Sequence, residues 1–173
     1  MTARPATGTM RLTRADASHA GGIAGVRNAA ADRLTHQHGH GYWSGHCSER
    51  GVLGDMKRGA SVYVALIDGL VIGTLTLHTR RPWAIDVKYF APDRRPLYLT
   101  NMAVAPEWQR SGVGRALLGD AARVALEWPA DAVRLDAFDA VAGAGPFYAK
   151  CGFTEVGRAA YRAVPLIYYE LLI

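Results

Sequence analysis

The stretch from Leu97 to Trp128 limits the possible folds of this chain more than any other part of it. Residues 97–104 form an apolar run that predicts a mostly buried strand, and Pro106 ends it because proline cannot donate to a sheet ladder. After a polar turn, apolar residues recur at spacings of three and four until Pro129, which is typical of an amphipathic helix. The sequence between strand and helix is Gln109-Arg110-Ser111-Gly112-Val113-Gly114-Arg115.

This loop leads into a helix N-terminus, a place that binds anions. The first backbone N–H groups of a helix lack partners and the helix dipole is positive there, which favours phosphates above all. Gly112 and Gly114 would let a phosphate approach the backbone, and Arg110 and Arg115 can add charge-assisted hydrogen bonds. A turn shaped only by glycines would not need the two arginines. We therefore expect a phosphate-bearing ligand at this loop.

Two other phosphate loops fit this stretch less well. A P-loop needs a lysine followed by Ser or Thr after its glycines, and the stretch contains no lysine. A dinucleotide fingerprint, GxGxxG, needs glycine or alanine in its last position, where this chain has Leu117. Asp136 does lie about 20 residues further on, as the ribose-binding acid of that fingerprint would. A nucleotide-binding oxidoreductase is therefore a weak alternative.

The same stretch resembles the pyrophosphate loop of the GCN5-related N-acetyltransferases, which carry Q/R-x-x-G-x-G/A between their fourth strand and third helix. Residues 109–114 match this motif in full. Residues 146–153, PFYAKCGF, are similar to the family's second block, a short helix with a tyrosine before the start of a strand. Val141 stands where the family often has an asparagine, and Asp139 is the nearest polar residue.

The resemblance implies acetyl-CoA as cosubstrate, with its pyrophosphate on the glycine loop and its pantetheine arm along the end of the fourth strand. It also implies that Tyr148 gives a proton to the departing CoA thiolate, since a phenol and a thiol have pKa values of about 10 and 8.5. The implied CoA-binding residues are Met102, Ala103, Val104, Gln109, Arg110, Ser111, Gly112, Val113, Gly114, Arg115 and Asp139.

The implied activity is direct transfer of an acetyl group to a primary amine of a small molecule or a protein. A non-catalytic acyl-CoA-binding regulatory module is the alternative from another class. It gains some support because many family members place a glutamate on the fourth strand, where this chain has Thr100 and Asn101. The sequence names no clear base for the amine; His78, Asp86 and Tyr98 are conceivable.

The acceptor side of the site is expected in two irregular segments. In the family, the segment between the first two helices commonly forms an acceptor wall, which Tyr42 and Trp43 would suit; packing beneath their own loop is an equal alternative. His78 and Asp86 belong to segment 78–96, which could also reach the acceptor. Residues 35–47 hold four histidines and a cysteine, but the second ligand pair of a zinc site is missing, so a polar loop without metal is predicted.

Length, composition and charge limit the class of protein to which this chain can belong. A chain of 173 residues, half of them apolar, predicts one acetyltransferase domain over residues 10–173 after a flexible tail, residues 1–9. No apolar run could span a membrane, and two cysteines make no disulfide framework, so we expect a cytoplasmic protein. The net charge of +5 comes without long runs of like charge, so no nucleic-acid surface is indicated. A homodimer is possible.

Periodicity along the chain predicts the element order β-α-α-β-β-β-α-β-α-β-β. This order favours an α/β fold with a mixed, mostly antiparallel central sheet flanked by helices and one parallel strand pair at the phosphate loop, in agreement with the acyl-CoA N-acyltransferase fold. Helices are expected over 17–34, 48–58, 113–128 and 143–151. Strands are expected over 10–14, 61–67, 70–77, 97–104, 133–138, 153–160 and 164–172.

Overall fold

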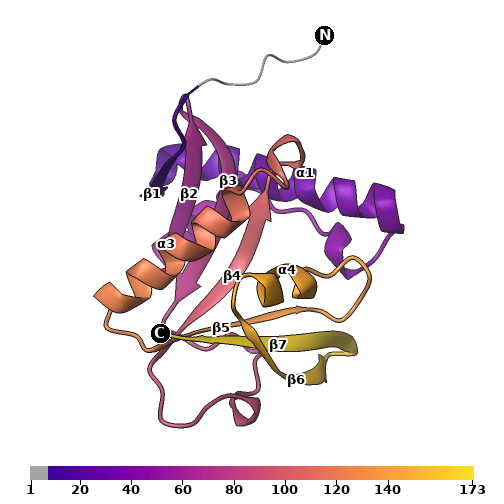
Figure 1. The fold of residues 1–173 in the computed structure, drawn as a ribbon. Helices are drawn as coiled ribbons and strands as arrows, with labels where there is room; N and C mark the ends of the chain where they lie inside the picture. Colours follow the sequence, from indigo (N-terminus) through magenta and orange to yellow (C-terminus); the bar gives the residue numbers. More distant parts are fainter. Residues whose placement is uncertain (1–7) are drawn as a thin grey trace.

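One seven-stranded sheet organises residues 8–173, the part of the chain that this computed structural model describes (Figure 1). The predicted flexible tail over residues 1–9 lies almost entirely outside that part and stays a prediction. The strand order is β1-β2-β3-β4-β5-β7-β6, in which β4 and β5 pair in parallel and the other neighbours pair antiparallel. The strands are β1 (Arg11–Arg14), β2 (Ser61–Ile67), β3 (Leu70–His78), β4 (Pro96–Val104), β5 (Ala132–Phe138), β6 (Thr154–Tyr161) and β7 (Val164–Leu172).

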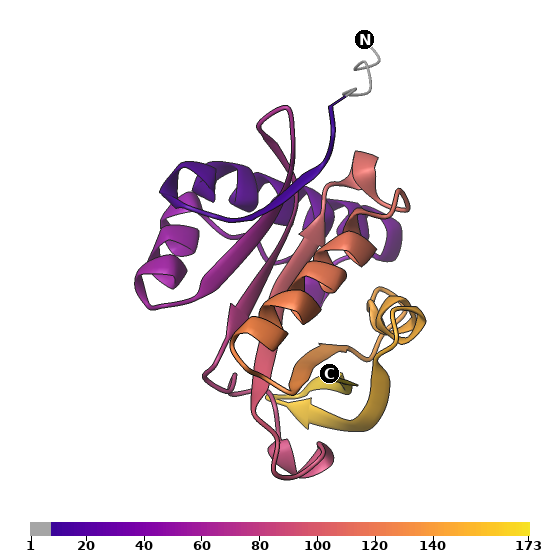
Figure 2. The same cartoon turned by 60° about the vertical axis from the view of Figure 1, so that its left-hand side comes forward.

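Helices cover both faces of the sheet, and the predicted fold class is confirmed (Figures 1 and 2). No helix within residues 8–173 combines the length and the apolar character needed to cross a membrane. The α-helices are α1 (Ala20–His38), α2 (Glu49–Lys57), α3 (Val113–Glu127) and α4 (Gly145–Lys150). Four short 3-10 helices are η1 (Ala17–His19), η2 (Tyr42–Ser44), η3 (Val87–Tyr89) and η4 (Pro106–Trp108).

Strand β2 shows how the sheet separates two cores. Every residue of β2 is buried, which is why its sequence is a continuous apolar run. Val62, Val64 and Leu66 pack in the cluster that contains α1, whereas Tyr63 and Ala65 pack in the cluster that contains α3. The predicted Asp-Gly hairpin joins β2 to β3: Asp68 and Gly69 have φ values of 50° and 79°, as a tight hairpin turn requires.

Helix α1 is longer than the sequence predicted. We expected it to end near Leu34 and a polar loop to start at Thr35, but the helix continues to His38. The Thr35 hydroxyl donates to the carbonyl of Ala31 (2.8 Å), and the helix stops only at Gly39, where φ is 79°. The prediction was wrong there because polar composition alone does not end a helix: residues 35–38 contain no glycine or proline, and the first residue that can leave the helix at positive φ is Gly39.

Strands β4 and β5 pair over three residues only and then separate. Their register runs from Pro96 opposite Ala132 to Tyr98 opposite Arg134, although both strands continue well beyond it. Figure 1 shows the two strands diverging, with α4 beside the opening. Two residues of β4, Asn101 and Met102, stand opposite one residue of β3. This bulge gives Asn101 a φ of 52° and bends β4 at the opening.

A buried ion pair fixes the long segment between β3 and β4 to the sheet. Arg134 of β5 and Glu170 of β7 are each 5% exposed, and Arg134 Nε lies 2.8 Å from Glu170 Oε1. Both side chains also bind the backbone of Ala91: the guanidinium donates to its carbonyl (2.6 Å), and its N–H donates to the carboxylate (3.2 Å). The Arg134 guanidinium lies over the ring of Phe90 as well. The segment before β4 is therefore held by charge-assisted hydrogen bonds.

We predict that Glu170→Gln lowers the free energy of unfolding by about 3 kcal/mol, because it leaves a buried guanidinium without its counter-charge. The matched control is Glu155→Gln on β6, which breaks the exposed pair between Glu155 and Arg158 and should change that free energy by less than about 1 kcal/mol. Urea denaturation of both variants measures the difference. Equal losses of unfolding free energy in the two variants would show that the buried ion pair stabilises the protein no more than the exposed one.

Candidate functional site

The glycine loop presents unpaired backbone N–H groups at the start of α3. The first helical hydrogen bond runs from the N–H of Ala116 to the carbonyl of Gly112 (3.0 Å), so the N–H groups of residues 113–115 have no partner within the helix. Gly112 has a φ of 93° and Arg110 a φ of 64°, which turns the backbone sharply. The Gln109 side chain ties the loop to β4 by donating to the Val104 carbonyl (3.0 Å). The loop is thus a preformed anion site.

The free edge of β4 continues from this loop. Beyond Tyr98, β4 pairs with β3 on one side but has no strand partner on the side of β5. Backbone groups alternate along a strand: the Ala105 N–H donates to the Ile72 carbonyl of β3 (2.9 Å), so Ala103 also faces β3 and Val104 faces the gap. An extended ligand with amide groups can bind along this edge. Residues 102–104 line a cavity of about 650 Å³ together with the glycine loop.

Three neighbouring cavities border β4. The 650 Å³ cavity at the glycine loop shares Leu34, Met102 and Tyr148 with a cavity of about 380 Å³ between the diverging strands. That middle cavity shares Thr100 and Asn101 with a third cavity of about 770 Å³ beyond the bulge. A ligand held at the glycine loop can therefore meet a second molecule that enters from the far side.

Tyr148 stands between the first two cavities. It lies on α4, is 7% exposed, and its hydroxyl is 3.8 Å from the sulfur of Met102. Its ring packs against Phe147, Phe153 and Tyr169. Burial, with a smaller contribution from the charge of Asp136, raises the pKa of the Tyr148 phenol far above its ordinary value. The hydroxyl therefore keeps its proton and is a hydrogen-bond donor.

Asp136 is the functional candidate that sequence reasoning missed in this role. It lies in the middle of β5 and lines the middle cavity with Tyr148. Burial raises the pKa of its carboxyl, and its carboxylate has no side-chain hydrogen bond or ion pair within residues 8–173. The signal was present in β5: Val133, Leu135 and Ala137 pack in the α3 core, which leaves Asp136 on the opposite face. An unpaired, half-buried carboxylate can accept a proton.

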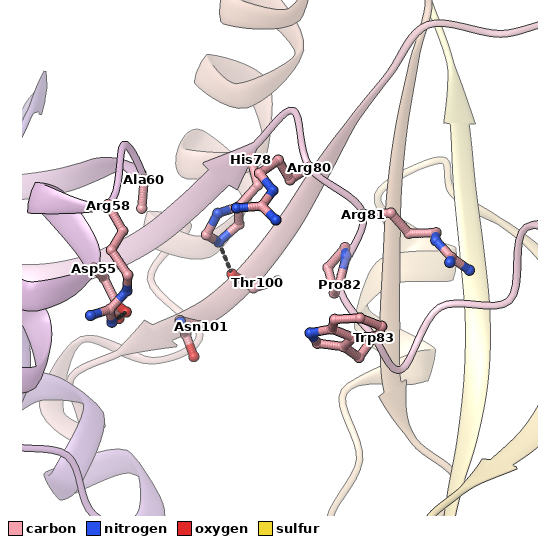
Figure 3. A pocket seen from close by; sticks show the side chains of 10 residues that line it. All are labelled: Asp55, Arg58, Ala60, His78, Arg80, Arg81, Pro82, Trp83, Thr100 and Asn101. Atoms are coloured by element: carbon pink, nitrogen blue, oxygen red, sulfur yellow. Dashed lines mark hydrogen bonds and ion pairs between the residues drawn. The ribbon is translucent and has the colours of Figure 1, made fainter.

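His78 marks the start of the third cavity, shown in Figure 3. It ends β3, and its Nε2 lies 2.9 Å from the hydroxyl of Thr100. Burial lowers the pKa of its imidazole, while the charge of Asp55 opposes that shift. The ring is therefore mainly neutral at pH 7. Its predicted contribution to the acceptor side has a structural basis, because it lines this cavity.

Some predicted residues are not brought into the cavities. Asp139 lies 3.1 Å from Arg158 and lines neither CoA-side cavity. Asp86 binds Lys88 and lies outside the cavity that holds His78. Ser111 turns its hydroxyl to the carbonyl of Trp108. Val113 is buried in the core and can contribute only its backbone.

The two predicted aromatic wall residues differ in position. Tyr42 is 55% exposed, and its ring centroid lies 6.2 Å from that of Phe138, which lines the middle cavity. Trp43 instead packs on its own loop, against His38 and the carbonyl of Gly39. Tyr42 is thus near the cavity and Trp43 is not among its lining residues.

The histidine-rich segment, residues 35–47, covers the end of α1 and the loop that follows it. His36 and His38 occupy the last turn of α1, and His46 pairs with Asp32 (2.6 Å). Across residues 8–173, no three side chains of His, Cys, Asp or Glu come together in a way that could hold a metal ion.

Comparisons with known proteins agree with this architecture. A sequence model described as the Acetyltransferase (GNAT) family matches residues 27–153. No curated protein matches the chain in sequence.

Solved structures share the fold. A putative acetyltransferase from Salmonella typhimurium with its cofactor acetyl-CoA is 19% identical, with a TM-score of 0.68 and coverage of 94% of this chain and 93% of that one. The ribosomal-protein-alanine N-acetyltransferase from Brucella melitensis is 18% identical, with a TM-score of 0.68 and coverage of 94% and 99%. The PaiA N-acetyltransferase from Thermoplasma acidophilum in complex with coenzyme A is 14% identical, with a TM-score of 0.69 and coverage of 92% and 98%.

We predict that Gly114→Val abolishes most coenzyme A binding. A Cβ at Gly114, which lines the loop cavity, would lie 3.0 Å from Phe147 Cζ, so a branched side chain must displace Phe147 or enter the cavity. Gly119→Val on the same helix is the matched control, because a Cβ there meets nothing within 4 Å. The measurement is the rise in Tm with coenzyme A, which follows RT ln(1 + [L]/Kd). An unchanged rise in Gly114→Val would contradict the assignment of the loop.

Proposed function

The chain belongs to the acetyltransferase (GNAT) family, and we propose on that basis that it transfers an acetyl group from acetyl-CoA directly to a primary amine of a small molecule or a protein. The observation that carries the proposal is the set of three neighbouring cavities that border β4, each of which shares lining residues with the next. It supports a reaction in which two substrates approach from opposite ends. The two substrates would meet in the middle cavity, which Tyr148 and Asp136 line.

We propose one orientation for acetyl-CoA in the cavity at the glycine loop. Its pyrophosphate is expected on the N–H groups at the start of α3, with Arg110 and Arg115 beside it. The pantetheine amides follow the free edge of β4 past Ala103 and Met102, which brings the thioester to the middle cavity. Backbone N–H groups on this edge can stabilise negative charge on the thioester oxygen during the reaction.

The amine must lose a proton because only the neutral form is a nucleophile. Asp136 is the proposed base: it shares the cavity with Tyr148, and its raised pKa brings it closer to the pKa range of an effective proton acceptor. As the amine's proton passes to Asp136, a C–N bond forms to the thioester carbon. Collapse of the tetrahedral intermediate then breaks the C–S bond and expels CoA as a thiolate.

Tyr148 is proposed to stabilise that thiolate by donating a hydrogen bond. The sequence suggested proton transfer, since an ordinary phenol has a pKa of about 10. In its buried position the phenol is a much weaker acid than a thiol, so the proton remains on the tyrosine oxygen at equilibrium. Burial of the donor strengthens the hydrogen bond to a charged acceptor.

The non-catalytic module is disfavoured by the same features. A protein that only bound acyl-CoA would have no need for a half-buried carboxylate without an ion-pair partner in residues 8–173, or for a cavity on the far side of the thioester. Catalysis explains both. A primary amine as acceptor, a cytoplasmic location and a homodimer remain predictions.

We predict that the wild-type protein releases free CoA when acetyl-CoA is supplied with an accepted amine, and that Tyr148→Phe lowers kcat on the order of 10²-fold. Binding of acetyl-CoA should survive, because the ring that packs against Phe153 remains. Tyr169→Phe is the control: this tyrosine packs on the same ring but lines none of the three cavities. A kcat within about twofold of wild type in both variants would remove Tyr148 from the mechanism. Binding of acetyl-CoA without any transfer would favour the non-catalytic module.

We predict that Asp136→Asn loses most activity and gains stability. In the wild type, kcat/KM should fall as pH decreases through the pKa of Asp136, at a pH above that of an ordinary aspartate, and this limb should vanish in the variant. The folded-state pKa lies above the unfolded one, so ionisation lowers the free energy of unfolding as pH rises through it. Asparagine cannot ionise, so Asp136→Asn avoids this loss of unfolding free energy, and its Tm at neutral pH should be higher than that of the wild type. Lower Tm with lower activity would indicate a structural role instead.

A further inference from the structure

The third cavity has a chemical character of its own. It lies beyond the bulge in β4, between the end of α2, the end of β3 and residues 80–83 (Figure 3). Its volume of about 770 Å³ is in the range of small-molecule sites. Thr100 and Asn101 connect it to the middle cavity, where the proposed reaction takes place.

Positive charge dominates the lining of this cavity. Three guanidinium groups, those of Arg58, Arg80 and Arg81, line it against the single carboxylate of Asp55. Arg58 and Asp55 neutralise each other in an ion pair of 2.6 Å. The two remaining guanidinium groups have no carboxylate partner among residues 8–173. His78 adds no positive charge in its neutral form.

Arg80 and Arg81 are available to different degrees. Arg81 donates one hydrogen bond to the carbonyl of Ile85 (3.0 Å), and Figure 3 shows its guanidinium turned away from Thr100 and Asn101, toward the rim of the cavity. Arg80 has no side-chain hydrogen bond or ion pair within the described residues. Figure 3 shows Arg80 beside His78 on one side of the cavity and Arg81 with Trp83 on the other. The guanidinium of Arg80 therefore lies at the cavity without a partner in the described part of the chain, whereas Arg81 adds positive charge at the rim.

This charge distribution discriminates among amines. A primary amine arrives from water largely as an ammonium ion, which the two arginines repel. A polyamine or an aminoglycoside would bring several such charges. An amine that also carries a carboxylate or a phosphate arrives with no net positive charge, and its anionic group can form charge-assisted hydrogen bonds with a guanidinium.

We propose that this cavity holds the acceptor and selects small primary amines that carry an anionic group. The inference rests on the proposed acetyl transfer and names the acceptor class for that same site. The anionic group binds Arg80, with the positive charge of Arg81 at the rim of the cavity, and the amine points past Thr100 toward the middle cavity. The indole of Trp83, which is 85% exposed, offers an aromatic face to the body of the acceptor.

The positive charge also favours the reaction. An ammonium ion near two guanidinium groups gives up its proton more readily than in water, because the charged form is destabilised. Asp136, in the neighbouring cavity, is close to the path of that proton. Arg80 thus holds the anionic end of the acceptor, and the two positive charges help to free its amine.

The test compares amino acids with their amides. Each pair has the same amine and nearly the same size, and only the acid has the anion. With acetyl-CoA and wild-type protein, we expect kcat/KM for accepted amino acids, or for phosphoethanolamine, to exceed that for the matched amides and for spermidine by about 10-fold or more. Free CoA release measures the rate.

Variants of Arg80 connect this preference to the cavity. Arg80→Gln should lower kcat/KM for the acid by about 10- to 100-fold and leave the amide almost unchanged, and Arg80→Glu should reverse the preference. Arg94→Glu is the matched control, because Arg94 is an exposed arginine of the same segment that does not line the cavity. A second measurement needs no turnover: the acid should raise the Tm of the wild-type protein saturated with CoA, but not that of Arg80→Glu.

The outcomes separate this inference from the proposed function. If amides, spermidine or a peptide N-terminus are acetylated best, acetyl transfer stands and the anionic acceptor class is overturned. If the acid raises Tm through Arg80 but no amine is acetylated, the cavity binds as inferred and the transfer reaction fails. If Arg80→Glu changes neither rate nor Tm, Arg80 does not bind the acceptor and the inference is wrong.

Discussion

The early separation of β4 and β5 is the constraint on which the rest of the structure depends. Sheets gain stability from continuous pairing, yet this pair ends at Tyr98 and Arg134. The unpaired edge would be unfavourable in a dry core, so the gap requires either solvent or a ligand with amide groups of its own. The bulge at Asn101 and the packing of α4 beside the gap keep the two strands apart. Cosubstrate binding therefore completes an edge that folding leaves open.

The gap also sets the chemistry of the groups that border it. Tyr148 and Asp136 come from opposite sides, and burial shifts the pKa of both upward because it disfavours their charged forms. For the phenol this means a permanent hydrogen-bond donor. For the carboxyl it means a stronger proton acceptor than an exposed aspartate, at the expense of folding stability. One physical effect, desolvation, thus favours the neutral form of both groups, which suits the two different roles proposed for them.

How much the sequence predicted depends on the range of the interactions involved. The hairpin at Asp68, the strand periods and the position of the glycine loop between a strand and a helix depend on neighbouring residues, and they were predicted correctly. The extension of α1 to His38 was missed because the polar residues 35–38 suggested a loop, although the first helix-ending residue is Gly39. Asp136 was visible in the sequence, but its role depends on which strand lies beside β5 and where that strand turns away. Such information is not local.

The sign of the charged side chains differs between the three cavities that border β4. Arg110 and Arg115 make the glycine loop positive, and Arg80 and Arg81 make the third cavity positive. Asp136, in the cavity between them, brings the one negative charge of the middle cavity. An anion at either end is attracted, while a proton released in the middle is repelled by both ends and drawn to the carboxylate. In the proposed reaction, this arrangement would separate the binding of two anionic groups from the removal of one proton.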